Sequence, residues 1–163
     1  MLDYDELYAS KLVAALDRQH PRDLSDVMLL FKSGGITPRM RRAFTVYLAD
    51  TIGQSELLAP HHKDIRVEFK SDFAGMTNRD VVVEQLIEVR EQLFRGFPAS
   101  FDELERNFLL SVNRLRTCWR NPQITGCRKP AAIRWKLLNL QKLFKSNRVK
   151  YIAITDSLSN MFQ

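Results

Sequence analysis

Residues 11–27 read KLVAALDRQHPRDLSDV, and this stretch shows how the chain is built. Apolar residues recur at helical spacing on both sides of His20-Pro21, which predicts two helices that meet at a turn. Proline disfavours helical geometry in the residue before it and suits the first turn of the helix that follows. We therefore expect a helix over residues 5–18 and a second helix that begins at Pro21 and stops at Gly34-Gly35.

The rest of the chain continues this helical periodicity. Caps, prolines and glycines predict further helices over residues 38–50 and about 64–73. A long helix is expected from the cap Thr77-Asn-Arg-Asp80 to Gly96-Phe97-Pro98, and the next helix from the capping box Ser100-x-x-Glu103 to about residue 116. The last two are expected over residues 131–145 and, more weakly, at the C terminus. No segment alternates with period two for long enough to predict a strand. The sequence therefore predicts an all-α helical bundle.

Composition narrows the class of protein. The 163 residues are 45% hydrophobic and 27% charged, as in ordinary globular proteins, and no apolar run approaches the ~18 residues of a membrane span. Cys118 and Cys127 have no further cysteine or histidine at ligand spacing, so no metal site is expected there. We interpret the two cysteines as free thiols in a reducing cytoplasm, and the alternative is a disulfide between them.

The charge distribution is strongly polarised. The net charge is +6, yet no acidic residue occurs between Glu105 and Asp156, a window that holds twelve lysines and arginines. A basic patch of this kind favours RNA as a partner, and the alternative is a solvated helical face without acids. Trp135 and Trp119 are candidate anchors for a protein partner or, alternatively, core residues. The candidate RNA-binding residues are Arg114, Arg116, Arg120, Arg128, Lys129, Arg134 and Lys136.

The opening stretch also contains candidate residues for phosphate chemistry. It places Lys11 on one helix and Arg22, Asp23 and Asp26 at the start of the next. Spacing alone permits a purely structural role, because acids in a first helical turn complement the helix dipole and can pair with Arg18 or Arg22. Lys11 could likewise simply extend to water.

The run from Leu7-Tyr8 through residue 27 resembles the C-terminal half of the AbiEii/AbiGii nucleotidyltransferase toxins. Further blocks match in order, namely Gly35-Ile-Thr, Phe73-Ala-Gly-Met-Thr77 and Arg134-Trp-Lys-Leu-Leu-Asn-Leu140. The resemblance implies a polymerase-β-like nucleotidyltransferase domain followed by a helical domain, in a toxin of a bacterial toxin–antitoxin or abortive-infection system. It also implies transfer of a nucleotide from an NTP to an acceptor, tRNA for some members, with Mg²⁺ as cofactor.

The family's late motifs, a lysine in a K-L-x-A setting and an R-D-x-x-D group, fall on the residues already singled out. The resemblance implies that Lys11 neutralises triphosphate oxygens, as a point charge suited to that role. Arg22 would be a second NTP-binding residue, and Asp26 or Asp23 would orient the lysine or the nucleotide. Ser25 departs from the family, which usually has an aromatic residue at this position.

The family's early motifs, a Gly-Ser turn and a metal-binding D-x-D pair, have no counterpart here. Asp3-Tyr4-Asp5 lies too close to Lys11 and is expected to begin a helix. We expect residues 1–33 to be the remnant of a truncated nucleotidyltransferase domain and residues 34–163 the C-terminal helical domain, inactive alone and without productive NTP and Mg²⁺ binding. The alternatives are a non-catalytic RNA-binding, antitoxin-like or protein-interaction module, or a chain that acts with a cognate antitoxin or a separate N-terminal half.

Overall fold

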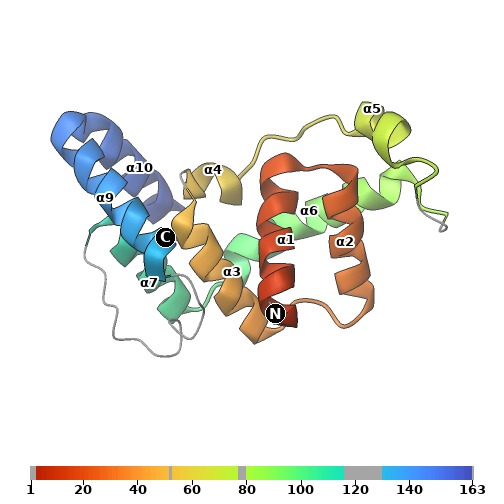
Figure 1. The fold of residues 1–163 in the computed structure, drawn as a ribbon, viewed down its shortest axis with the longest axis horizontal. Coiled ribbons are helices and arrows are strands. Elements are labelled where there is room, and N and C mark those ends of the chain that lie inside the picture. The colour runs from red at the N-terminus through yellow and green to blue at the C-terminus, as the bar shows by residue number, and fades with distance from the viewer. Residues whose placement is uncertain (1–2, 52, 77–79, 116–129, 163) are drawn as a thin grey trace.

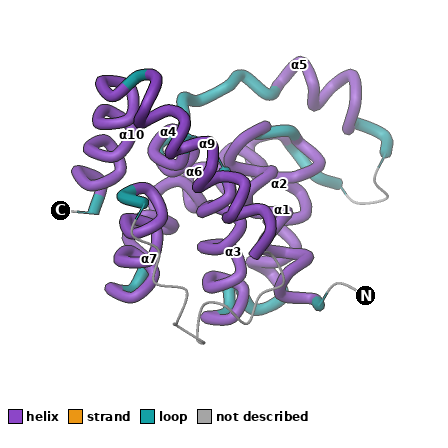
Figure 2. Tube along the Cα trace, turned by 60° about the vertical axis from the view of Figure 1, so that its left-hand side comes forward, coloured by secondary structure: helices purple, strands orange, loops and turns teal. Residues whose placement is uncertain are grey.

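The computed structural model describes residues 3–51, 53–76, 80–115 and 130–162, and only the backbone of residues 130–132. Every regular element in these residues is a helix, which confirms the all-α prediction (Figures 1 and 2). The elements are α1 (Tyr4–Arg18), α2 (Pro21–Lys32), α3 (Pro38–Asp50), α4 (Gln54–Leu58), α5 (Arg66–Glu68), the π-helical turn η1 (Phe69–Phe73), α6 (Val83–Ser100), α7 (Glu103–Asn113), α9 (Pro130–Ser146) and α10 (Arg148–Met161).

The first three helices begin where the sequence predicts. α2 starts at Pro21, and the backbone N–H of Arg22 donates to His20 Nδ1 over 3.3 Å. Gln19 makes the turn before it with a left-handed backbone, at φ 53°. α3 starts at Pro38, and Thr37 Oγ1 caps it by accepting from the N–H of Met40 at 3.0 Å.

The helix ends around residue 100 differ from the prediction. α6 does not stop at Gly96-Phe97-Pro98, because it continues to Ser100 with Pro98 inside it. A proline in the last turn interrupts the backbone ladder only where the helix is about to end anyway. The capping box is made by Asp102 and Glu105 instead of Ser100 and Glu103, through N–H to carboxylate bonds of 2.8 and 2.9 Å.

The preceding cap also differs. α6 begins only at Val83, and of the predicted cap at 77–80, residues 77–79 lie outside the described part of the chain.

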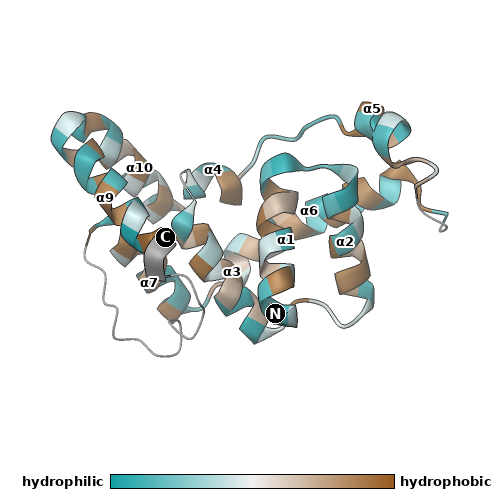
Figure 3. Ribbon diagram, in the orientation of Figure 1, coloured by the Kyte–Doolittle hydropathy of each residue, from teal (hydrophilic) through white to brown (hydrophobic). Residues whose placement is uncertain are grey.

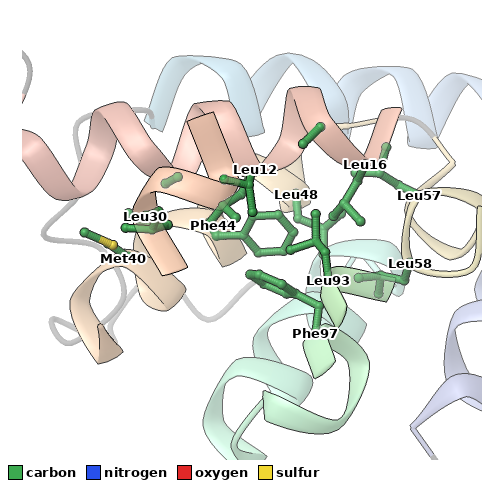
Figure 4. Packing of buried hydrophobic residues seen from close by; sticks show 14 of the residues in the cluster. Leu12, Leu16, Leu30, Met40, Phe44, Leu48, Leu57, Leu58, Leu93 and Phe97 are labelled. Carbon is green, nitrogen blue, oxygen red and sulfur yellow. The ribbon is translucent and has the colours of Figure 1, made fainter. Parts of the chain in front are cut away.

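One hydrophobic core joins the N-terminal helices, and Figure 4 shows Phe44 of α3 between α1 and α6. Its ring is fully buried and its centroid lies 4.1 Å from that of Phe97.

The hairpin of α9 and α10 lies at one end of the molecule and α5 at the other, with α1, α2 and α6 between them (Figure 1). A hydrogen bond attaches α10 of this hairpin to α7, and a second one attaches α7 to α4. Tyr151 Oη donates to the carbonyl of Asn113 at 2.9 Å, and the Asn113 amide donates to Gln54 Oε1. Figure 3 shows hydrophilic residues alternating with hydrophobic ones along both helices of the hairpin. Among the described residues, no helix has the length and apolar character needed to cross a membrane.

Candidate functional site

Two ion pairs join α1 to α2 across one face of their hairpin. Lys11 Nζ donates to Asp26 Oδ2, and Arg18 Nη2 donates to Asp23 Oδ1 at 2.9 Å. The two cations, Lys11 and Arg18, are seven residues apart and therefore lie on the same face of α1. The two aspartates, Asp23 and Asp26, are three residues apart and therefore lie on the same face of α2. The two ion pairs therefore lie one after the other on the same side of the hairpin.

These contacts separate the two aspartates that the sequence left equivalent. Asp26 is the partner of Lys11, and both side chains stay about one-third exposed, at 36% and 32%. Asp23 is 14% exposed and pairs with Arg18, which is the structural arrangement considered from spacing alone. Geometry thus singles out Asp26 as the acid that can orient Lys11.

Tyr8 lies beside the Lys11–Asp26 pair, one turn earlier on α1. Its ring centroid is 4.7 Å from that of Tyr4. Burial raises the pKa of Tyr8 above its ordinary value, and the neighbouring Tyr4 and the charge of Asp26 act in the same direction. Nothing in the sequence pattern indicated that Tyr8 would lie near Asp26.

A polar pocket of about 490 Å³ opens beside the turn between α1 and α2. Arg22 lines it and reaches across to the π-helical turn, where Nη2 donates to the carbonyl of Asp72 at 3.3 Å and to Met76 Sδ at 2.8 Å. The structure thus groups Arg22 with the pocket and Lys11 with Asp26. The pocket is lined by Arg18, Gln19, His20, Arg22, Asp23, Lys63, Asp64, Ile65 and Glu68.

A buried hydrogen-bond network holds the wall of this pocket. Gln19 Oε1 accepts from the N–H of Lys63 at 3.0 Å, and Gln19 Nε2 donates to the carbonyl of His61 at 2.7 Å. Arg90 of α6, also buried, donates to the carbonyl of Lys63 at 2.6 Å. Sequence reasoning missed Gln19 and Arg90, because their partners are remote in the chain and neither residue belongs to a motif.

The Asp3-Tyr4-Asp5 sequence does not form a metal site. The guanidinium of Arg39 pairs with both carboxylates, at 3.3 Å from Asp5, and Thr37 Oγ1 donates to Asp5 at 3.1 Å. Asp3 is the N-cap of α1 and Asp5 lies in its first turn, as expected for a helix start. In the described ranges, no group of three or more histidine, cysteine, aspartate or glutamate side chains is arranged to hold a metal ion.

The candidate RNA-binding residues have different surroundings. Arg114 and Arg134 are exposed, and Arg114 Nη2 donates to Ser159 Oγ at 3.2 Å. Trp135 is 60% exposed, so its interpretation as a core residue is wrong. Arg116, Arg120, Arg128 and Lys129 lie outside the described residues, as do Cys118, Trp119 and Cys127.

Lys136 is a correction to the predicted RNA-binding set. Its side chain is buried, at 3% exposure, and Nζ donates to the carbonyl of Thr51 at 2.7 Å. Thr51 follows the last residue of α3, where the helix dipole favours a cation. Lys136 therefore attaches α9 to α3 and is not available to a phosphate. Burial lowers the pKa of Lys136 to about 7, while the carboxylate of Asp50 acts in the opposite direction.

This buried lysine makes stability depend on pH. Between pH 7 and the ordinary lysine pKa of 10.5, the unfolded chain binds a proton that folded Lys136 has lost. The free energy of unfolding should therefore rise with pH, by about 2 kcal/mol from pH 7 to pH 9. Urea denaturation at each pH measures this slope. Lys136→Met should remove most of it, and Lys142→Met, at an exposed position of α9, should keep it. Equal slopes in both variants would show that Lys136 titrates normally.

The two ion pairs of the α1–α2 hairpin and the neighbouring pocket are set in an all-helical frame. Residues 1–111 match the family model described as nucleotidyl transferase AbiEii toxin, type IV toxin–antitoxin system. The match covers more than half of the 163 residues, so the chain belongs to this family. Searches among curated proteins and among solved structures give no match.

Proposed function

We propose that this chain supplies the lysine–aspartate half of a nucleotidyltransferase site in a toxin of a type IV toxin–antitoxin system. The observation that carries the proposal is the direct contact between Lys11 and Asp26. The pairing brings together one residue from each of the family's two late motifs, although they lie fifteen positions apart. Family membership over residues 1–111 supports the reaction class.

The pair has the chemistry that triphosphate binding needs. An ammonium group has three N–H donors, and Asp26 accepts only one of those of Lys11. The partial exposure of Lys11 leaves the remaining donors open to phosphate oxygens. Asp26 holds the ammonium in place, which reduces the reorganisation required when the substrate binds. In this proposal Asp23 is a structural residue and Arg22 contributes positive charge at the pocket.

Residues 1–33 are proposed as the last part of the nucleotidyltransferase domain and residues 34–163 as the helical domain, although one core spans both. Nucleotidyl transfer depends on positioning and metal-assisted charge stabilisation, and the carboxylates of Asp3 and Asp5 are paired with Arg39. The chain alone is therefore proposed to be inactive, acting in the cytoplasm with metal-binding motifs from another polypeptide segment. A toxin–antitoxin family also implies a cognate antitoxin as a partner.

Nucleotide transfer tests this proposal directly. The purified 163-residue chain should transfer no label from any radiolabelled NTP to RNA in the presence of Mg²⁺. Joined to or mixed with a family N-terminal half that carries the Gly-Ser and D-x-D motifs, it should restore transfer. Each half alone is the control. Magnesium-dependent labelling by the chain alone would contradict the proposed half-site, and no gain on combination would contradict the proposed role of Lys11 and Asp26.

RNA is proposed as the acceptor, because the window between Glu105 and Asp156 holds twelve basic residues and no acid. Lysine and arginine side chains that neutralise RNA phosphates give an affinity for RNA that falls as the salt concentration rises. The exposed positions of Arg114 and Arg134 support this proposal, and the burial of Lys136 removes that residue from it.

A further inference from the structure

Helix α9 has a buried and an exposed face. Ile133, Lys136 and Leu140 are buried against the rest of the molecule. The hydrogen bond from Lys136 to the carbonyl of Thr51 fixes the rotation of the helix about its axis. The residues on the opposite side of α9 therefore point consistently toward solvent.

Five exposed residues form that opposite side, which we call the Trp135 face. At 3.6 residues per turn they fall within about 100° around the helix axis. Trp135 and Leu138 are 60% and 64% exposed. The face consists of Arg134, Trp135, Leu138, Lys142 and Lys145.

The indole ring of Trp135 is available for a ligand. Among the contacts found in the described residues, none engages this ring, and its exposure is unusual for the largest apolar side chain. Phe144 on the same helix differs, because Tyr151 packs edge-on against it at 5.1 Å and the guanidinium of Arg148 lies 5.4 Å from its centroid. Within the described part of the chain, Trp135 is thus a largely exposed aromatic surface among cations.

The charges around Trp135 select the ligand. Arg134, Lys142 and Lys145 give the face three positive charges, and α9 contains no acidic residue. Single-stranded nucleic acids combine an anionic backbone with accessible base faces, and proteins bind them with basic grooves and aromatic side chains. In a duplex the base faces are stacked on one another and are closed to a side chain.

We propose that the Trp135 face binds single-stranded RNA, with an unpaired base stacked on Trp135 and the backbone phosphates paired with Arg134, Lys142 and Lys145. The choice of RNA rests on the proposed function, which needs an acceptor. The face lies on α9, whereas the Lys11–Asp26 pair joins α1 to α2, so acceptor binding and triphosphate binding are separable (Figure 1).

Equilibrium binding to the full chain tests this proposal without any NTP or N-terminal half. The probe is a short fluorescein-labelled oligouridine, and fluorescence anisotropy gives Kd over a series of salt concentrations. Trp135→Ala should weaken binding about 5- to 150-fold, because base stacking on an aromatic contributes about 1–3 kcal/mol. Its salt dependence should stay unchanged, since no charge is removed. Lys142→Gln should instead reduce the slope of log K against log salt by about 0.7.

Matched variants distinguish stacking from general apolar contact. Trp135→Phe should retain most of the affinity, whereas Trp135→Leu should lose as much as Trp135→Ala. Tyr4→Ala removes an aromatic that is similarly exposed, at 54%, in the acid-rich N-terminal part, and should leave binding unchanged. Each Trp135 variant should unfold within about 0.5 kcal/mol of the parent chain, because the side chain is exposed.

Several results would overturn the proposal. They are an absence of oligouridine binding at low salt, equal affinities of the parent chain and Trp135→Ala, or equal affinities of Trp135→Phe and Trp135→Leu. Self-association that Trp135→Ala abolishes while RNA affinity stays constant would assign the face to a second copy of the chain. A failed transfer assay with intact RNA binding contradicts only the proposed transferase function, and the reverse outcome contradicts only the Trp135 face.

Discussion

Replacing Lys11 with alanine is expected to lower nucleotide transfer by the completed enzyme at least about 100-fold. Removing one preorganised group that stabilises transition-state charge typically costs about 10²–10³ in rate. Lys11 is the cation that the structure holds in place through Asp26. The measurement is the initial rate of label transfer from an NTP to RNA, with the chain combined with its N-terminal half.

The matched control is Lys32→Ala, which removes an exposed lysine from the last turn of α2. It should leave the transfer rate within about twofold, since its energetic effect is confined to the helix end. The Lys11–Asp26 pair is partly exposed, so its loss should change the free energy of unfolding by only about 1 kcal/mol. A large loss of activity in Lys32→Ala, or an unchanged rate in Lys11→Ala, would contradict the assignment.

Asp26 has a different expected signature, because it acts through Lys11. Asp26→Asn keeps the size of the side chain and removes its charge, so Lys11 remains but is less well oriented. The effects of Lys11→Ala and Asp26→Asn should then be strongly non-additive, since the second change matters little once the lysine is gone. Additive effects on the transfer rate would show that Asp26 acts independently of Lys11.

Local signals predicted the fold well where they acted alone. His20-Pro21 and Thr37-Pro38 each combine a cap with a first-turn proline, and both helix starts are confirmed. Around residue 100 two capping patterns overlap, Ser100-x-x-Glu103 and Asp102-x-x-Glu105. Tertiary structure selects the second pattern, because Glu105 also pairs with Arg41 of α3. That partner lies sixty-four positions away and cannot be read from a local window.

In the candidate site, too, local sequence patterns identified residues, and only the tertiary packing showed their contacts. Sequence motifs identified Lys11, Asp23 and Asp26, but only the packing of α1 on α2 shows that Asp26 contacts Lys11. Charge counting placed Lys136 among exposed cations. Lys136 lies three residues after Ile133 and four before Leu140, so it shares their buried face of α9. The error arises because composition counts charges without considering which side of a helix carries them.

Replacing Glu105 with alanine is expected to lower the free energy of unfolding by about 3–5 kcal/mol, a large part of the stability of a domain of this size. Glu105 is 1% exposed, and Arg41 Nε lies 3.0 and 2.8 Å from its two carboxylate oxygens. One of these oxygens also accepts from the N–H of Asp102 at 2.9 Å. The substitution therefore leaves a largely buried guanidinium with only Asp102 as an ionic partner, and it removes the capping box.

Urea denaturation of the full chain measures this effect, and two further variants separate its causes. Glu103→Ala, on the same helix and exposed, should cost no more than about 1 kcal/mol. The double variant Arg41→Met with Glu105→Leu should recover much of the stability, because replacing a buried pair by apolar residues removes the unpaired charge. If Glu105→Ala costs as little as Glu103→Ala, the pair does not attach α7 to α3. If the double variant is no more stable than Glu105→Ala, the loss comes from the cap and the packing of α7, and not from an uncompensated Arg41.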